Sequence, residues 1–202
     1  PVLQFGTIQT EDIEITTVQH SNEKKNFIKG SLNKLDEIID IDFEELSHNN
    51  GSMLDIYHVN YSSNFNENVV GTAISQRSQY GSWWEILWKE SNLQGEINSK
   101  SNENTIIHEI GHTLGLSHPF NDATDESWDS EDTVMSYNIS ENGWSDWYSE
   151  ADINALIAIW GRENDLGIIN FEKNSFDYKY KKNSNETYSI LTDIGSEDIT
   201  DI

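Results

Sequence analysis

Apolar residues recur along this chain in patterns that predict helices and strands separated by polar loops. Between residues 22 and 39 they fall three or four positions apart, which predicts an amphipathic helix with Ser21 or Asn22 placed to cap it. Stretches rich in alternating, β-branched or aromatic residues predict strands at 53–61, 69–74 and 83–88. The polar run 92–104 predicts a loop.

Two further helices follow from the same reasoning. One begins near residues 102–104, buries an apolar face and stops at Gly115, since glycine commonly ends a helix. The other spans 150–160, where Ser149 and Asp152 form a capping-box pattern and Gly161 follows the last turn. Beyond Gly167 the segments alternate like strands, so we expect a boundary there and no internal repeat.

Composition narrows the classes of function. The formal net charge is -24, from 36 acidic and 12 basic residues, which disfavours nucleic acid and anionic membranes as partners. No run of 18 or more apolar residues is present, so we expect no membrane span. The chain has no cysteine, so any metal site must use His, Asp, Glu or Tyr. It opens at Pro1 without a signal-peptide pattern, and we expect any secretion signal or pro-segment to lie outside it.

Residues 108–120 carry the chemistry. His108 and His112 are four positions apart, which places both imidazoles on one helix face where they can converge on one metal ion. Glu109 is rotated by about 100° from His108, so it lies beside the ion and is available as a base. Gly115 breaks the helix and lets the chain return His118 to the same ion. Three histidines leave a fourth position for water, which is typical of catalytic zinc.

The motif H-E-x-x-H-x-x-G-x-x-H is identified as that of the metzincin metallopeptidases. These enzymes also have a Met-turn beneath the zinc ligands, and residues 133–137 read Thr-Val-Met-Ser-Tyr. Pro119 directly after the third histidine, the sequence Met-Ser-Tyr and the helix at 152–161 resemble the serralysin family of secreted bacterial endopeptidases. The resemblance covers roughly residues 1–165.

The resemblance implies an α+β metzincin-like catalytic domain. Its twisted, mostly parallel sheet would have an antiparallel edge strand and would pack on two long helices. A smaller, irregular C-terminal subdomain would carry the Met-turn and a last helix. We therefore expect a catalytic domain at 1–167, with an upper part at 1–115 and a lower part at 116–167. The strand-like segment 168–202 resembles the lead-in to the family's calcium β-roll, although the glycine-rich repeats themselves are absent.

The resemblance also implies roles for individual residues. His108, His112 and His118 would bind zinc, and Glu109 would be the general base. Met135 would lie beneath the site, although ordinary core packing also explains a methionine. Tyr137 would stabilise the oxyanion, although it is equally read as a packed aromatic residue. An extended substrate would pair with the strand at Gly71, Thr72 and Ala73, which is otherwise an ordinary strand with a glycine bulge.

The function that this predicts is a secreted, extracellular, bacterial zinc endopeptidase, a monomer that acts on protein or peptide substrates. The alternative is a zinc-containing binding or adhesion module that keeps the scaffold without proteolysis. A pro-segment or inhibitor partner would lie outside this chain. The acidic run 121–132 offers hard oxygen ligands for calcium, or else forms a solvated surface loop. Trp83, Trp84 and Trp128 are candidates for the walls of the specificity pocket.

Overall fold

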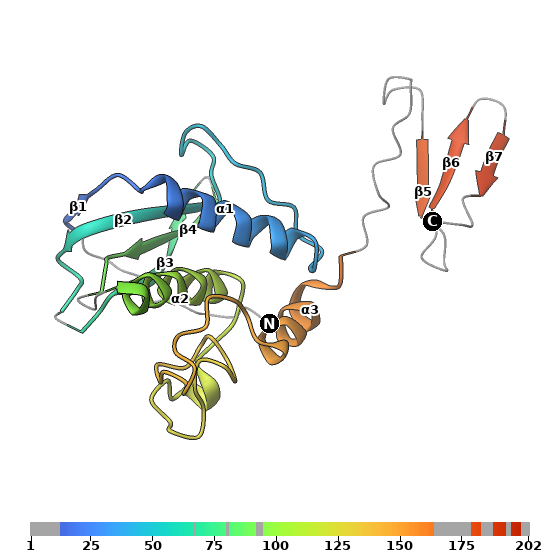
Figure 1. Ribbon diagram of the computed structural model, residues 1–202. Coiled ribbons are helices and arrows are strands. Elements are labelled where there is room, and N and C mark those ends of the chain that lie inside the picture. The colour runs from blue at the N-terminus through green and yellow to red at the C-terminus, as the bar shows by residue number, and fades with distance from the viewer. Residues whose placement is uncertain are drawn as a thin grey trace. The chain divides into compact units, whose positions relative to one another are not determined.

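The computed structural model describes residues 13–66, 68–79, 81–91 and 95–163, together with the backbone of three short strands nearer the C-terminus. The chain divides into two compact units, Pro1–Glu163 and Asn164–Ile202. In the described part of the first unit, a four-stranded sheet packs with three α-helices (Figure 1). No helix in the described residues is long and apolar enough to cross a membrane.

The sheet has the strand order β1-β2-β4-β3, so β1 (Ile15–Thr17) and β3 (Gly71–Ser78) are its edges. The inner strands β2 (Leu54–Ser62) and β4 (Gly81–Trp88) pair in parallel. The pairings β1–β2 and β3–β4 are antiparallel. The α+β class and the antiparallel edge strand are confirmed. The sheet is mixed, because β3 and β4, which follow each other along the chain, pair antiparallel and the short β1 adds a second antiparallel edge.

Helices α1 and α3 begin where the capping residues predict, although α1 ends three residues before the predicted residue 39. α1 (Asn22–Asp36) is capped by Ser21, whose side chain accepts a hydrogen bond from the Lys24 amide. α3 (Glu150–Trp160) begins with the predicted capping box of Ser149 and Asp152 and ends at Gly161, which has φ +91°. Both helices contribute apolar residues to the same core cluster, in which Leu35 and Leu156 are fully buried.

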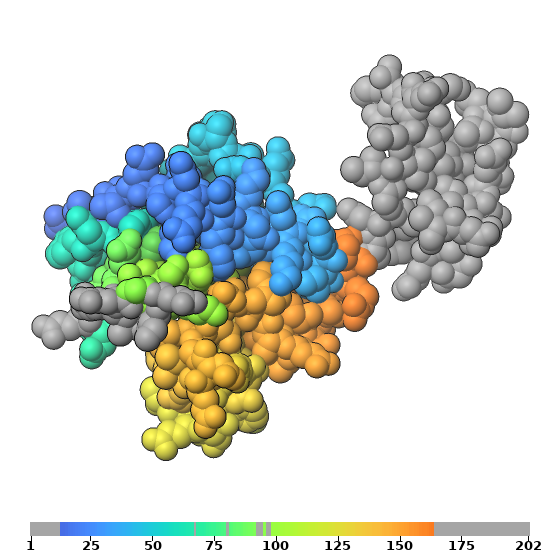
Figure 2. All heavy atoms as spheres, viewed as in Figure 1, coloured from blue at the N-terminus to red at the C-terminus, as the bar shows by residue number. Residues whose placement is uncertain are grey.

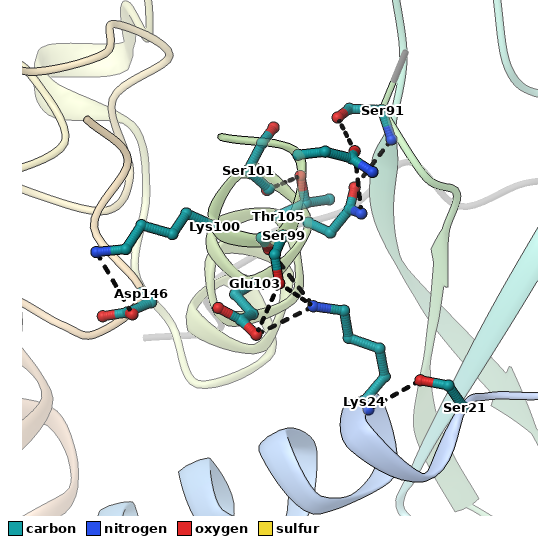
Figure 3. A network of polar contacts seen from close by, with 11 residues as sticks. Ser21, Lys24, Ser91, Ser99, Lys100, Ser101, Glu103, Thr105 and Asp146 are labelled. Carbon is teal, nitrogen blue, oxygen red and sulfur yellow. Dashed lines mark hydrogen bonds and ion pairs between the residues drawn. The ribbon is translucent and has the colours of Figure 1, made fainter. Parts of the chain in front are cut away.

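Helix α2 (Gly95–Thr113) begins well before the predicted start, and the expectation of a loop throughout 92–104 is therefore wrong. The first half of α2 lacks an apolar stripe, and polar contacts hold it instead (Figure 3). Lys24 from α1 reaches across to Glu103, with an Nζ–Oε1 distance of 3.0 Å, and to Ser99. Asn102 accepts a hydrogen bond from the Ser91 amide. Hydrophobic periodicity does not predict polar tertiary contacts such as these, so the first half of α2 was not predicted as helix.

In the larger of the two hydrophobic clusters described, buried residues of the sheet and of the three helices pack together. α2 contributes Ile106, Ile107 and Ile110, all fully buried, and β4 contributes Ile86 and Trp88. The chain between α2 and α3 is irregular, apart from the short 3₁₀ helix η1 (Pro119–Asn121). Figures 1 and 2 show this yellow-to-orange segment on the side of α2 away from α1. It folds onto the end of α2, where the three histidines of the motif lie.

The second unit is described only by its strands. β5 (Lys179–Lys182), β6 (Tyr188–Thr192) and β7 (Gly195–Asp198) form an antiparallel sheet in that order. The other residues of the predicted 168–202 segment lie outside the described residues, as do residues 1–12. The likeness of this segment to a β-roll stays a prediction.

Candidate metal centre and active site

The end of helix α2 brings the three motif histidines together. His108 and His112 lie on its last turns, and Gly115 follows with φ +100°. The amides of Gly115 and Leu116 donate to the carbonyls of His112 and Gly111, at 3.1 and 2.9 Å. This pair of hydrogen bonds is a Schellman motif, which requires a residue in the left-handed region and therefore favours glycine. The reversed chain then carries His118 back towards the helix.

The spacing of the three imidazoles fits one tetrahedral metal ion. One nitrogen from each of His108, His112 and His118 lies within 4.8 Å of the other two. The Nε2 atoms of His108 and His118 are 3.4 Å apart. Two nitrogens bound tetrahedrally at about 2.0–2.1 Å would be separated by about 3.4 Å. In the described part of the chain, no other group of three potential ligand residues meets this criterion.

Backbone carbonyls orient two of the rings. The Nδ1 atom of His108 lies 2.8 Å from the Val134 carbonyl oxygen, and that of His112 lies 3.0 Å from the Leu116 carbonyl oxygen. A carbonyl can only accept, so each Nδ1 carries the proton and each Nε2 presents a lone pair. A hydrogen bond of this kind is typical of metal-binding histidines. The donor set is three imidazoles without sulfur, which suits zinc.

Burial keeps the imidazoles neutral. His108 is almost fully buried, and loss of solvation lowers its pKa to about 3, with a further contribution from His112. Desolvation also lowers the pKa of His112 and of His118. Neutral imidazole is the form that binds metal, so the three rings are ready to bind at neutral pH.

Glu109 is a buried carboxyl beside this cluster, with a relative exposure of 6%. Burial raises its pKa to about 8, and a hydrogen bond from the Ala73 backbone only partly opposes the rise. Strand β3 covers it closely: a Cβ built on Gly71 would lie 2.7 Å from Glu109 Oε1 and 2.7 Å from Thr105 Cγ2. Only glycine fits at this point. A divalent cation bound nearby would lower the pKa of Glu109 and favour its ionised form.

The predicted substrate strand therefore lies against the predicted base. Gly71 and Ala73 contact Glu109, and Thr72 between them pairs with Leu87 of β4. β3 is an edge of the sheet, so one side of its backbone has no strand partner among the described strands. Trp83 and Trp84 pair with Gln76 and Ser75, which are four or five residues from Gly71 along β3. They are two or three residues, or about 7–10 Å of strand, beyond Ala73, so these two tryptophans lie farther along the sheet than the contact with Glu109.

Met135 lies beneath the helix that carries the ligands, with a relative exposure of 1%. A Cβ on Gly111 would lie 3.0 Å from its sulfur and 3.4 Å from Cε1 of Tyr148. Tyr148 also donates a hydrogen bond of 2.7 Å to the Ile107 carbonyl. Gly111 thus lets the segment 133–137 approach α2 closely, directly behind the histidines.

Tyr137 is half-exposed and faces the cluster. Its ring centroid is 5.0 Å from that of His118 and 5.4 Å from that of His108. Desolvation raises the pKa of its hydroxyl, and the nearby Glu109 raises it further. The hydroxyl therefore stays protonated at neutral pH and can donate a hydrogen bond.

Asp152 is a residue whose role the sequence reasoning missed beyond its part in the capping box. Its buried carboxylate accepts hydrogen bonds from Thr133 Oγ1, from the Val134 amide and from Ser149. The Val134 carbonyl in turn accepts from His108. One side chain thus ties α3 to the segment that orients the first histidine. The capping-box pattern shows an aspartate at this position, but nothing in the sequence shows that Val134 lies next to it.

The acidic run 121–132 folds as a surface loop. Its carboxylates cap their own backbone, as in the hydrogen bonds from the Thr124 amide to Asp122 and from the Ser127 amide to Asp125. Together with the other described residues, the run provides no cluster of three acidic or histidine ligands. Calcium binding here is therefore not supported.

Comparison with known proteins agrees with this geometry. A family model described as metallo-peptidase family M12 matches residues 6–149, which is well over half of the chain. The serralysin of Photorhabdus luminescens is 35% identical over 112 residues, which covers 45% of this chain and 23% of that protein. The chain thus matches about a quarter of its relative's length. These findings confirm the resemblance to serralysin-like metzincins. The chain belongs to the metallopeptidase family M12.

Proposed function

We propose that this chain is the catalytic part of a zinc-dependent endopeptidase in which Glu109 is the general base. The observation that carries the proposal is the buried Glu109 carboxyl beside three neutral imidazoles whose spacing fits zinc. When bound, zinc lowers the pKa of a bound water molecule to about 7 and polarises a carbonyl oxygen. His108, His112 and His118 are the residues that would hold it.

Side chains and backbone of the protein would carry out proton transfer, stabilise the developing negative charge and position the substrate. The Glu109 carboxylate takes a proton from the attacking water and delivers it to the nitrogen of the leaving amine, while the new C–O bond forms and the peptide C–N bond breaks. The Tyr137 hydroxyl donates a hydrogen bond to the carbonyl oxygen as negative charge develops there. The free edge of β3 at Gly71, Thr72 and Ala73 pairs with the extended substrate, which holds the scissile bond next to Glu109.

The test replaces the base and keeps the metal ligands. Glu109→Gln preserves the size of the buried side chain but accepts no proton, so we expect zinc content to be unchanged and casein cleavage to fall at least about 10²-fold. Glu44→Gln is the matched control, because Glu44 is an exposed glutamate far along the chain from the motif. Full activity in Glu109→Gln would overturn the role of the base. Zinc-loaded protein that cleaves nothing would favour the binding module instead.

We further propose that the enzyme acts outside the cell. The support is the resemblance to secreted endopeptidases and the relation to serralysin, together with the strongly acidic composition. The activity would then be recovered from the culture medium of the source organism. Activity confined to the cell pellet would contradict the proposal.

A further inference from the structure

Phe120 is an exposed aromatic residue in a strained backbone conformation next to the metal centre. Its relative exposure is 84%, the highest among the exposed large hydrophobic residues described. Its φ and ψ are +49° and 24°, in the left-handed region that a bulky side chain rarely adopts. It lies two residues after His118. Strain of this kind persists where the surrounding structure holds it, and it gathers at functional sites.

A second ring extends the apolar surface. The centroids of Phe120 and Trp128 are 5.8 Å apart, within the range of aromatic contact. We call these two rings the aromatic ledge. Its loop is fastened to the segment behind the histidines: the Tyr137 amide donates to the Ala123 carbonyl at 2.7 Å, and Ser136 Oγ donates to the Trp128 carbonyl at 2.8 Å. Because the Tyr137 ring packs on His118, the aromatic ledge adjoins the site where the substrate would bind.

The surroundings of the aromatic ledge are negatively charged. Six carboxylates lie in the same loop: Asp122, Asp125, Glu126, Asp129, Glu131 and Asp132. Residues 101–161 contain no lysine or arginine, and none of the six carboxylates is in an ion pair within the described residues. Hydrogen bonds from Thr124 hold the pKa of Asp122 below its usual value, so this carboxylate stays ionised. The loop therefore presents aromatic faces within an uncompensated negative field.

We infer that the aromatic ledge is a substrate subsite that selects an arginine or lysine side chain near the scissile bond. This inference rests on the proposed function, because the occupant is the peptide that the metal centre cleaves. A cation is attracted to the face of an aromatic ring, and the apolar stem of arginine or lysine covers the ring surface. The surrounding carboxylates add a long-range attraction for the same charge. An acidic side chain at this position would be repelled.

The experiment separates binding from cleavage. Zinc-loaded Glu109→Gln protein is titrated with fluorescein-labelled, alanine-rich hexapeptides in which each position in turn carries arginine, citrulline or glutamate. Citrulline has nearly the shape of arginine without its charge. We expect at least one position where the arginine peptide binds about two- to fivefold more tightly than the citrulline peptide. The glutamate peptide should bind most weakly, and the ratio should shrink between low and high salt.

Substitutions at Phe120 test whether its ring causes the preference for arginine over citrulline. Phe120→Gly suits a φ of +49°, so the loop should keep its conformation while the preference for arginine disappears. Phe120→Tyr keeps a ring and should keep the preference. Leu46→Ala removes another exposed apolar side chain, 43% exposed and between α1 and β2 along the chain, and should change nothing.

Two results would overturn the subsite: no position favours arginine over citrulline, or the preference survives in Phe120→Gly. The proposed function is judged separately, by casein cleavage with the zinc-loaded parent chain. If the parent chain fails to cleave casein but the arginine preference is intact, the proposed peptidase function is rejected and the proposed cation-binding surface is retained.

Discussion

The most direct test of the site's packing is Gly71→Ala. The added methyl group would lie 2.7 Å from both Glu109 Oε1 and Thr105 Cγ2, and 3.0 Å from Glu109 Cγ. Carbon atoms in contact usually lie about 3.5–4.0 Å apart, so β3 or the Glu109 side chain must move by several tenths of an ångström or more. Overpacking of this kind costs about 1–3 kcal/mol. A displacement near 1 Å at a catalytic group can lower the rate about 10²-fold.

We therefore expect Gly71→Ala to lower kcat/KM on a fluorogenic peptide by about 10²-fold and the melting temperature by roughly 3–10 °C. Zinc content, measured by mass spectrometry, should not change, because the methyl group meets Glu109 and not the histidines. Gly30→Ala is the matched control: it is an exposed site within α1 where a Cβ meets nothing within 4 Å. Alanine there should raise stability by about 0.5–1 kcal/mol and leave activity unchanged.

A second substitution separates the two contacts. Thr105→Ser removes the methyl group that Gly71→Ala would meet but keeps the hydroxyl bonded to the Ser101 carbonyl. The double variant should recover part of the lost stability and little of the lost activity, since the contact with Glu109 remains. Wild-type activity and stability in Gly71→Ala would refute the packing of β3 on Glu109 and the reasoning built on it.

Three further predictions concern the scaffold. Asp152→Asn should lower the free energy of unfolding by about 2–3 kcal/mol and weaken zinc about 10–100-fold in a chelator competition, because the Val134 carbonyl that orients the first motif histidine would shift; unchanged zinc affinity would contradict this link. Lys24→Met should lower the free energy of unfolding by about 3–5 kcal/mol in urea, since it leaves the nearly buried Glu103 unpaired. Adding Glu103→Gln should restore part of that loss, and a double variant no better than the single one would argue against an ion pair. Burial lowers the pKa of His58 below 6.5, so its contribution to stability is present above pH 6.5 and is lost as the pH falls through the folded-state value. His58→Phe should therefore flatten the acid side of a melting-temperature profile, and an unchanged slope would refute this.

The local order of residues was enough to predict the elements that carry their own signals. The amphipathic stripe of α1, the capping box of Ser149 and Asp152 and the left-handed turn at Gly115 all follow from nearest neighbours along the chain. Elements held by distant contacts escaped the same reasoning. The first half of α2 depends on partners such as Lys24, which lies 79 residues from Glu103. The three-residue strand β1 depends on pairing with β2, since it is too short to show a pattern of its own.

By itself, the sequence determined the donors of the metal centre, because four-residue spacing on a helix and one glycine turn are local geometry. It also determined the absence of thiolate ligands and the negative charge around the site. Only the tertiary structure decided how those donors are oriented and surrounded. The Val134 carbonyl, the close approach of Gly71 and the burial that raises the pKa of Glu109 come from segments far apart along the chain. Backbone carbonyls orient the histidines, and the exclusion of water raises the pKa of Glu109. Neither can be predicted from which side chains are present, because both depend on how the chain folds.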